Sequence, residues 1–215
     1  MSELLTSDFE IVWMAGTENF IRSNEKRIQS KNIEVAIASE RELEQLGSFQ
    51  TNDAAVAVAK MKPNVSPNLK NEFGLVLDDL RDPGNVGTII RTADWYGIKN
   101  IIASEETADF YNPKTISATM GSFCRMKVFY TDLPEFLSKN AVPVFGTFMN
   151  GNDVHQTDFG TNGLIVIGNE SNGISNEVSK FVNHRITIPK IGGAESLNAA
   201  IAAGIVLDNV FRSKK

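Results

Sequence analysis

The sequence predicts an α/β protein whose larger part is a mostly parallel sheet covered by helices on both faces. Two observations carry this prediction. Apolar runs of strand length recur along the last two-thirds of the chain, as at residues 74–77, 164–167 and 185–188. Polar loops and helical segments lie between these runs. Strands that alternate with helices form parallel sheets, because each helical connection crosses one face of the sheet.

The expected elements of this larger part follow one another as strand and helix. No helix or strand is assigned to residues 114–125, which include Ser117 and Ser122. The last helix is unusually poor in charge and rich in alanine, so we expect it to be buried on more than one side. Strands are expected at residues 74–77, 100–103, 127–130, 142–147, 164–167 and 185–188, and helices at 86–96, 133–139, 176–182 and after 198.

The first part of the chain reads as a separate small unit. Candidate strands at residues 9–15, 34–39 and 54–60 alternate with candidate helices at 17–30 and 40–46. A stretch with two prolines and three asparagines follows and is typical of a linker. We therefore expect a small domain at residues 1–62, a linker at 63–71 and a larger domain at 72–215.

Composition bounds the kind of protein. The chain has 215 residues, is 42% hydrophobic and 22% charged, and fits a globular fold. Its one cysteine, Cys124, excludes an internal disulfide and a cysteine zinc site, and its apolar flanks favour a buried thiol. No apolar run approaches the roughly 20 residues of a membrane span, and no signal peptide is expected. These features predict a cytoplasmic protein.

The charge of the chain weighs against a nucleic-acid partner without excluding it. The net charge is −5 and the pI about 5.2, whereas contact with phosphates usually requires a basic face. A local basic patch can nevertheless lie on an acidic protein. We expect the scattered basic residues to converge in space, among them Arg22, Lys26, Arg27, Lys31, Arg81, Arg91, Lys114, Arg125 and Lys127.

Three strand-to-loop transitions carry the candidate functional residues. They lie at residues 75–93, 164–175 and 185–207, and each places Gly, Asn, Ser or acidic side chains directly after an apolar strand. In open α/β sheets, ligands bind beyond the carboxyl ends of the strands, in loops of this kind. The sequence therefore predicts that the three loops form one site.

Each candidate residue also has a purely structural interpretation. Ser196 and Asn198 fit caps of the last helix, because their oxygens accept free backbone N–H groups. Glu170 fits a helix-start charge that complements the helix dipole. Arg91 fits a surface arginine of an amphipathic helix. The Gly84–Gly87 segment lacks the Gly-Lys-Ser/Thr ending of a phosphate loop, so we set an NTPase aside.

Taken together, the three segments resemble the SpoU (TrmH) family of SPOUT RNA methyltransferases. Residues 85–93 match the family's Asn-x-Gly-x-x-x-Arg-Thr-Ala motif, residues 168–173 its Gly-x-Glu-x-x-Gly motif, and residues 188–198 its Ile-Pro…Ser-Leu-Asn motif. Order and spacing agree over about two-thirds of the chain. Each motif alone is weak, whereas all three in order are strong evidence.

The resemblance implies a reaction, a cofactor and a set of site residues. The implied activity is transfer of a methyl group from S-adenosylmethionine to a ribose 2′-hydroxyl of tRNA or rRNA. No metal is implied, and the chain shows no metal-ligand spacing. The implied catalytic residues are Arg91, Asn85, Glu170, Ser196 and Asn198. The implied cofactor-binding residues, acting mainly through the main chain, are Gly168, Ile188, Leu197, Thr147 and Phe148.

The resemblance also implies features that periodicity cannot show. The family's last segment passes through a loop to form a trefoil knot, which is very rare among folds. The position of residues 1–62 corresponds to an RNA-binding domain similar to ribosomal protein L30e, here in partial form. The family's dimeric state predicts a homodimer built chiefly from residues 72–215.

Two questions about the chemistry stay open at this point. Arg91 can act as a base together with an RNA phosphate, or it can stabilise developing negative charge, which is the plainer role for a guanidinium of very high pKa. The fold can also serve a binding module without the reaction, or a methyltransferase that acts on a base. Intact motif residues argue against the first alternative, and Arg91 with the Ser-Leu-Asn motif argues against the second.

Overall fold

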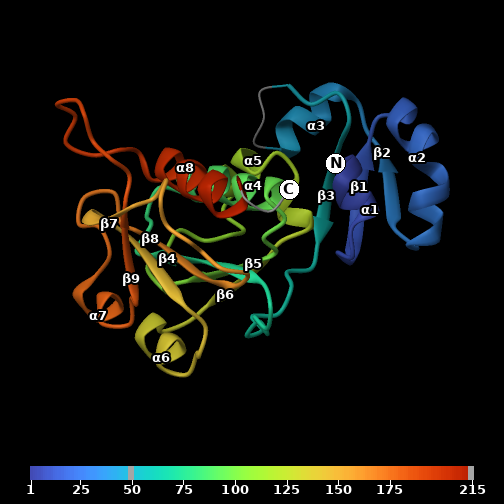
Figure 1. The fold of residues 1–215 in the computed structure, drawn as a ribbon. Helices are drawn as coiled ribbons and strands as arrows, with labels where there is room; N and C mark the ends of the chain where they lie inside the picture. Colours follow the sequence, from blue (N-terminus) through green and yellow to red (C-terminus); the bar gives the residue numbers. More distant parts are fainter. Residues whose placement is uncertain (48–50, 213–215) are drawn as a thin grey trace. The chain divides into compact units, whose positions relative to one another are not determined.

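The computed structural model describes residues 1–47 and 51–212. The chain divides into two compact units, Met1–Pro63 and Asn64–Lys215, each with a sheet of its own (Figure 1). Except for Pro63, the segment predicted as a linker, residues 63–71, belongs to the larger unit. In that segment Asn64 exchanges hydrogen bonds with the backbone of Tyr130, and Leu69 is buried in the core.

The small unit is a three-stranded mixed sheet with strand order β2-β1-β3. β1 pairs with β2 in parallel and with β3 antiparallel. The three strands alternate with α2 and α3 along the chain, so the predicted alternation of strands and helices is confirmed. Ser39 and Glu42 form a reciprocal capping box that starts α3 at the predicted residue. The elements are α1 (Ser2–Thr6), β1 (Ile11–Gly16), α2 (Glu18–Ser30), β2 (Glu34–Ile37), α3 (Glu40–Leu46) and β3 (Ala55–Ala59).

The larger unit contains a six-stranded sheet of order β6-β5-β4-β8-β7-β9, in which the paired strands run parallel. The predicted parallel sheet is therefore confirmed. Its strands are β4 (Phe73–Asp78), β5 (Asn100–Ala103), β6 (Lys127–Tyr130), β7 (Val144–Asp153), β8 (Gly163–Gly168) and β9 (His184–Thr187). Its helices are α4 (Pro83–Trp95), α5 (Pro113–Ala118), a short 3-10 turn (Ser122–Cys124), α6 (Leu133–Ser138), α7 (Asn176–Ser179) and α8 (Ala199–Arg212).

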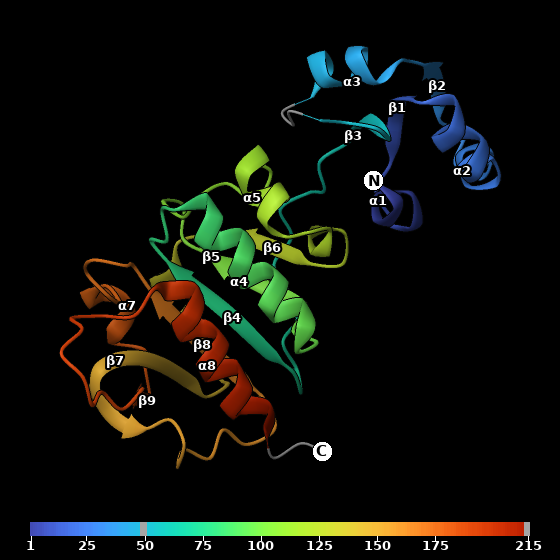
Figure 2. The ribbon, with the colours of Figure 1, turned by 90° about the horizontal axis from the view of Figure 1, so that it is seen from above.

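Helices cover both faces of this sheet (Figures 1 and 2). α4 and α8 pack on one face, where alternate strand residues such as Leu75, Leu77 and Ile165 form the main core. α6 and α7 pack on the other face against Val76, Val166 and their neighbours. Strands buried on both sides read as continuous apolar runs, and this is why β4 and β8 were recognisable in the sequence.

Three elements differ from the sequence-based expectation by three residues or more at one end. α4 was expected to begin at residue 86 but begins at Pro83, where Asp82 supplies the cap. β7 was expected to end at Thr147 but continues to Asp153, because Thr147 and Asn152 both pair with Ile186 and the residues between them form an excursion from the strand. α7 was expected to reach residue 182 but ends at Ser179. Among the described residues, no helix is long and apolar enough to cross a membrane.

Candidate functional site

A chain of hydrogen bonds joins the three predicted loops at the carboxyl ends of the strands. The amide nitrogen Nδ2 of Asn85 donates to Oε1 of Glu170 over 2.9 Å. The amide nitrogen of Asn198 donates to Oδ1 of Asn85 over 3.0 Å. Glu170 lies 85 positions after Asn85 in the sequence, and Asn198 lies 113 positions after it. Asn85 therefore connects one residue from each of the other two motifs.

The start of α4 fixes the position of Asn85. Asp82 is the N-cap of this helix and accepts a 2.8 Å hydrogen bond from the backbone N–H of Asn85, while Pro83 supplies a helix-compatible φ. The Lys114 ammonium donates to the other oxygen of Asp82, and this bond, with the backbone bonds, lowers the pKa of the Asp82 carboxyl below its usual value. The cap therefore stays ionised.

Asn198 has both of the roles considered for it. Its Oδ1 accepts hydrogen bonds from the backbone N–H groups of Ala200 and Ile201, so it caps α8. Its Nδ2 is thereby directed away from the helix and reaches Asn85. The two interpretations of this residue are compatible because the oxygen serves the helix and the nitrogen serves the site.

Glu170 lies in a tight loop rather than at a helix start. The next helix, α7, begins only at Asn176, so the interpretation of Glu170 as a charge that complements a helix dipole is wrong. Asn169 and Gly173 close the loop by exchanging two backbone hydrogen bonds of 3.0 and 2.9 Å. Gly173 has a φ of +69°, and a Cβ on Gly168 would lie 2.3 Å from the backbone of Gly173. Both glycines are therefore required for the loop to close.

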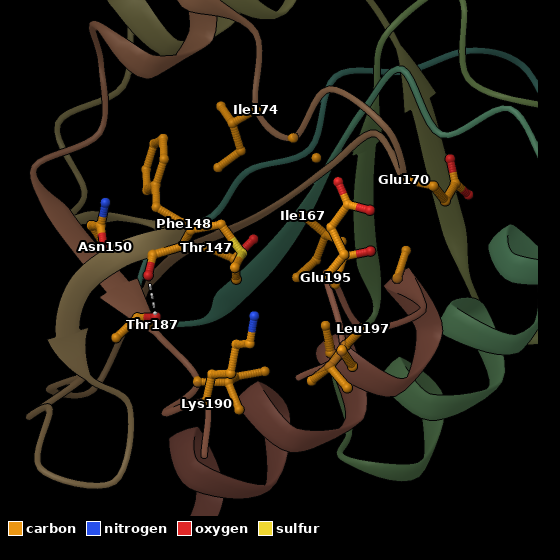
Figure 3. Close-up of a pocket in the computed structure, with 18 of the residues that line it drawn as sticks. Thr147, Phe148, Asn150, Ile167, Glu170, Ile174, Thr187, Lys190, Glu195 and Leu197 are labelled. Carbon is orange, nitrogen blue, oxygen red and sulfur yellow. Dashed lines mark hydrogen bonds between the residues drawn. The ribbon is translucent and has the colours of Figure 1, made fainter. Parts of the chain in front are cut away.

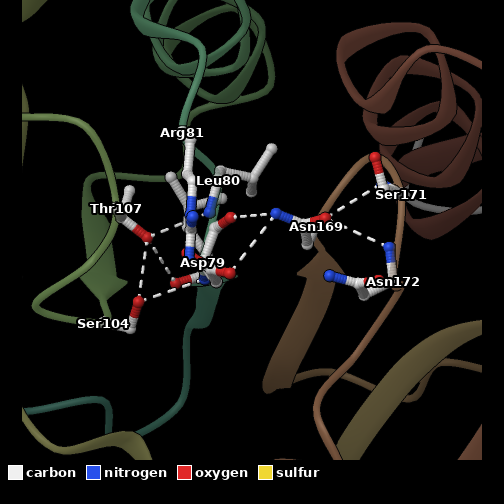
Figure 4. Close-up of polar contacts among 9 residues, drawn as sticks. Asp79, Leu80, Arg81, Ser104, Thr107, Asn169, Ser171 and Asn172 are labelled. Carbon is white, nitrogen blue, oxygen red and sulfur yellow. Dashed lines mark hydrogen bonds and ion pairs between the residues drawn. The ribbon is translucent and has the colours of Figure 1, made fainter.

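The side chain of Asn169 ties this loop to the segment between β4 and α4 (Figure 4). Its Nδ2 donates to the backbone oxygen of Asp79 over 2.7 Å, and its Oδ1 accepts from the N–H groups of Ser171 and Asn172. Asp79 has a φ of +56°, and its N–H donates to Ser104. The next N–H, of Leu80, donates to the hydroxyl of Thr107, so two polar side chains from a third loop support this conformation of the backbone.

A large cavity lies beside this group of residues. Its volume is about 920 Å³, and its walls come from the ends of β7, β8 and β9 and from the segment before α8. Figure 3 shows Phe148 and Asn150 on one side of the cavity and Glu170 on the opposite side. All five candidate cofactor-binding residues line it, together with Glu170 and Ser196. The five are Thr147, Phe148, Gly168, Ile188 and Leu197.

The structure does not bring Arg91 into this chain of hydrogen bonds. Arg91 lies six residues beyond Asn85 on α4, which places it about 9 Å along the axis and about 120° around it. Its side chain is exposed and, within the described part of the chain, forms no hydrogen bond or ion pair. Ser196 is exposed too, and no hydrogen bond of its side chain occurs among the described residues.

Several residues near the site were not singled out from the sequence. Asn169 and Asp79 are the main ones, and an asparagine beside a strand-ending glycine was the only available indication. Arg185, on β9, stacks its guanidinium 3.5 Å from the ring centre of Phe148 at the cavity wall. Charged Lys190 and Glu195 also line the cavity. No spacing rule relates these residues to the motifs.

The remaining candidates are ordinary polar or buried residues. Cys124 is buried, as expected. His155 contacts Asn209, and His184 stacks on Phe145, so neither histidine lies in the site. Arg81, Lys114 and Arg125 each pair with a carboxylate, of Asp79, Asp82 and Asp94 respectively. Among the described residues, no cluster of metal-ligating side chains occurs.

This arrangement defines an α/β protein with a cavity and a group of hydrogen-bonded polar side chains at the carboxyl ends of its strands. Comparison with known proteins gives the family. Residues 72–208 match the model of the SpoU rRNA Methylase family, which is more than half of the chain. The chain belongs to this family.

Individual relatives agree with this assignment. The 23S rRNA (guanosine(2553)-2'-O)-methyltransferase RlmP of Bacillus subtilis is 34% identical over 137 residues, 62% of this chain and 55% of that protein. The chain thus spans about half the length of this curated relative. A putative RNA methyltransferase of the TrmH family from Porphyromonas gingivalis is 30% identical, with a TM-score of 0.85 over 98% of this chain and 85% of that one. The SpoU methyltransferase AviRb of Streptomyces viridochromogenes, solved with AdoMet, is 26% identical, with a TM-score of 0.84 over 99% and 86%.

Proposed function

We propose that this protein transfers a methyl group from S-adenosylmethionine to a ribose 2′-hydroxyl of tRNA or rRNA. The observation that carries the proposal is the hydrogen-bonded chain of Asn198, Asn85 and Glu170 beside the cavity. Family membership and the printed activities of the relatives support it. A homologue solved with AdoMet supports the choice of cofactor.

The cavity fits a ligand of the size of S-adenosylmethionine. Ligand cavities usually measure about 300–1,000 Å³, and this one falls near the upper end. Ile188 and Leu197 supply apolar contacts, and the main chain near Gly168 supplies donors and acceptors. Thr147 uses its hydroxyl to bind the backbone oxygen of Val166, so its own backbone is held in place at the cavity wall.

The cofactor supplies an activated methyl group on a sulfonium. Attack of the ribose oxygen on this methyl carbon would break the carbon–sulfur bond and release S-adenosylhomocysteine, and the hydroxyl proton would pass to an RNA phosphate or to water. Asn85, fixed from both sides, orients the ribose or the phosphate next to it. Arg91 stabilises the negative charge that develops on the ribose oxygen, since its guanidinium pairs with no carboxylate of the described residues 1–47 and 51–212. Ser196 contacts the substrate or cofactor from the cavity rim.

RNA is the proposed partner, and the small unit is proposed to help bind it. Residues 1–62 act in this proposal as a partial L30e-like RNA-binding domain, joined through residues 63–71 to the methyltransferase domain at 72–215. On α2, Lys26 and Arg27 are not paired with carboxylates among the described residues. These side chains are available for phosphates. A cytoplasmic location follows from this substrate.

A homodimer and a trefoil knot complete the proposal. Large apolar side chains lie exposed on α4 and α8 and beside α5: Trp95 is 85% exposed, Ile201 56% and Met120 69%. Pairing of two copies over these helices buries them and brings the region of Arg91, one turn from Trp95, to the interface. The knot is proposed from membership of the SpoU family, and α8 lies beside α4 after the edge strand β9. Light scattering at micromolar concentration should give twice the chain mass.

Two measurements test the proposed reaction. Calorimetric titration should show binding of S-adenosylmethionine with the same affinity with and without a chelator, because no metal takes part. Incubation of labelled cofactor with RNA from cells that lack the gene, followed by nuclease digestion and mass analysis, should give a 2′-O-methyl nucleoside. Cofactor binding without transfer to any RNA indicates a binding module, and a base-methylated product indicates the other enzyme class.

A further inference from the structure

We propose that Asn169 is a positioning residue whose side-chain amide holds Glu170 against Asn85. This inference rests on the proposed function. The hydrogen bond between Asn85 and Glu170 is made by a flexible, partly exposed glutamate side chain. The entropy lost when such a side chain is ordered is comparable to the net gain from one hydrogen bond. The contact therefore requires a backbone that is already fixed.

Asn169 fixes that backbone in two directions. Within the loop, its Oδ1 accepts the N–H groups of Ser171 at 2.9 Å and Asn172 at 3.1 Å, and its own backbone closes the loop with Gly173. Outside the loop, its Nδ2 reaches the backbone oxygen of Asp79 at 2.7 Å and the Asp79 carboxylate at 3.4 Å. Glu170 is thus attached to a rigid loop that is itself attached to the segment before α4.

The segment that Asn169 contacts also leads to Asn85. Asp79 stands three residues before Asp82, the cap that binds the backbone of Asn85. The loop after β8 is therefore joined to the segment between β4 and α4 through Asn169 and to the start of α4 through Glu170, and at its far end the Ser175 N–H also donates to Asp78 over 2.7 Å. The contact of Asn169 joins a short side chain to the backbone oxygen of Asp79. It therefore sets the distance between the two segments, across which Glu170 then reaches Asn85.

The side chain of Asn172 provides a matched control in the same loop. Its backbone N–H is held by Asn169, but its side chain is exposed and forms no hydrogen bond or ion pair with a described residue. Asn172→Ala removes the same amide from the same loop without touching Asp79. Asn169→Asp is the second informative change, because it retains an acceptor for the two N–H groups and loses the donor to Asp79.

The first measurement does not depend on activity. Hydrogen exchange and the chemical shift of the Asn85 side-chain amide report its bond to Glu170, and NMR can follow both. We expect Asn169→Ala and Asn169→Asp to abolish the protection of this amide, and Asn172→Ala to leave it unchanged. An Asn85 amide that is equally protected in all three variants overturns the proposal, as does equal loss in Asn169→Ala and Asn172→Ala.

The second measurement is a double-mutant cycle in single-turnover methyl transfer. Misplacement of a reacting group by about 1 Å can cost a hundredfold in rate, so Asn169→Ala should slow transfer by about tenfold or more. In a Glu170→Ala background, which lacks the acceptor of the Asn85 hydrogen bond, the same change should alter the rate by less than about threefold, because Asn169 acts through Glu170. Equal losses in both backgrounds contradict the inference while leaving the proposed function standing. Absence of transfer by the unchanged protein contradicts the proposed function, and the NMR result then decides on Asn169 alone.

Discussion

Asn85→Asp is the substitution that most sharply tests the geometry of the site. It retains the size of the side chain but replaces the donor that meets Glu170 at 2.9 Å with an oxygen. Two carboxylates with charges about 4 Å apart repel by about 1 kcal/mol in water and about 4 kcal/mol at an effective dielectric constant of 20. Because one pKa unit corresponds to about 1.4 kcal/mol, a half-buried pair should hold one proton about 1–3 units above the usual carboxyl range.

Carbon-13 NMR titration of labelled Asp and Glu carboxyl groups measures this directly. The Asn85→Asp variant should show one more carboxyl titrating at about pH 5–7 than the unchanged protein does. The raised pKa exists only in the folded state, so the free energy of unfolding of the variant, relative to the unchanged protein, should fall as pH rises from about 4 to 7. Asn172→Asp places a carboxyl at an exposed position in the loop that holds Glu170. This variant should show neither a raised carboxyl pKa nor the fall in the free energy of unfolding. If Asn85→Asp gains no carboxyl with a raised pKa relative to the unchanged protein, the contact between Asn85 and Glu170 does not exist in solution.

Three further changes test the surroundings of the site. Gly168→Ala places a Cβ 2.3 Å from the backbone of Gly173 and should destabilise the protein by about 1–3 kcal/mol, seen as a lower melting temperature; an unchanged melting temperature contradicts the close packing. Burial raises the pKa of Asp78 in the folded state, so Asp78→Asn should increase the free energy of unfolding at pH 7 and not at pH 3. Denaturant titrations at both pH values measure this, and an equal change at the two pH values contradicts the prediction. Leu197→Arg introduces a long charged side chain at the cavity wall and should abolish binding of S-adenosylmethionine, measured by calorimetry. An unchanged affinity would mean that the cofactor binds outside this cavity.

Local signals in the sequence were sufficient for most of the fold. β5 and β6 begin and end at the predicted residues, because apolar runs bounded by polar turns define short buried strands. The capping box of Ser39 and Glu42 fixed the start of α3. The excursion of β7 after Thr147 was not predictable, since it depends on which residues of β9 pair with it.

The candidate site was predictable only in part, for a physical reason. The motifs identified Asn85, Glu170 and Asn198, and the structure joins these three by hydrogen bonds. Their contacts arise from parallel strands whose ends meet at one edge of the sheet, not from local spacing. Asn169 was missed because its role depends on the backbone oxygen of Asp79, 90 positions away. A hydrogen bond to a backbone oxygen cannot be recognised from the order of residue types in the sequence.

Single-turnover methyl transfer by Arg91→Ala tests the central claim most directly. Loss of one preorganised donor costs about 2.7–4 kcal/mol, or roughly a hundred- to thousandfold in rate. We predict that Arg91→Ala binds S-adenosylmethionine within about threefold of the unchanged protein and transfers methyl groups to unmodified RNA at least about a hundredfold more slowly. Arg91→Lys should recover little of the rate, because an ammonium lacks the planar set of donors. Near-normal transfer by Arg91→Ala would contradict the proposed catalytic role, and loss of cofactor binding would make the role of Arg91 structural.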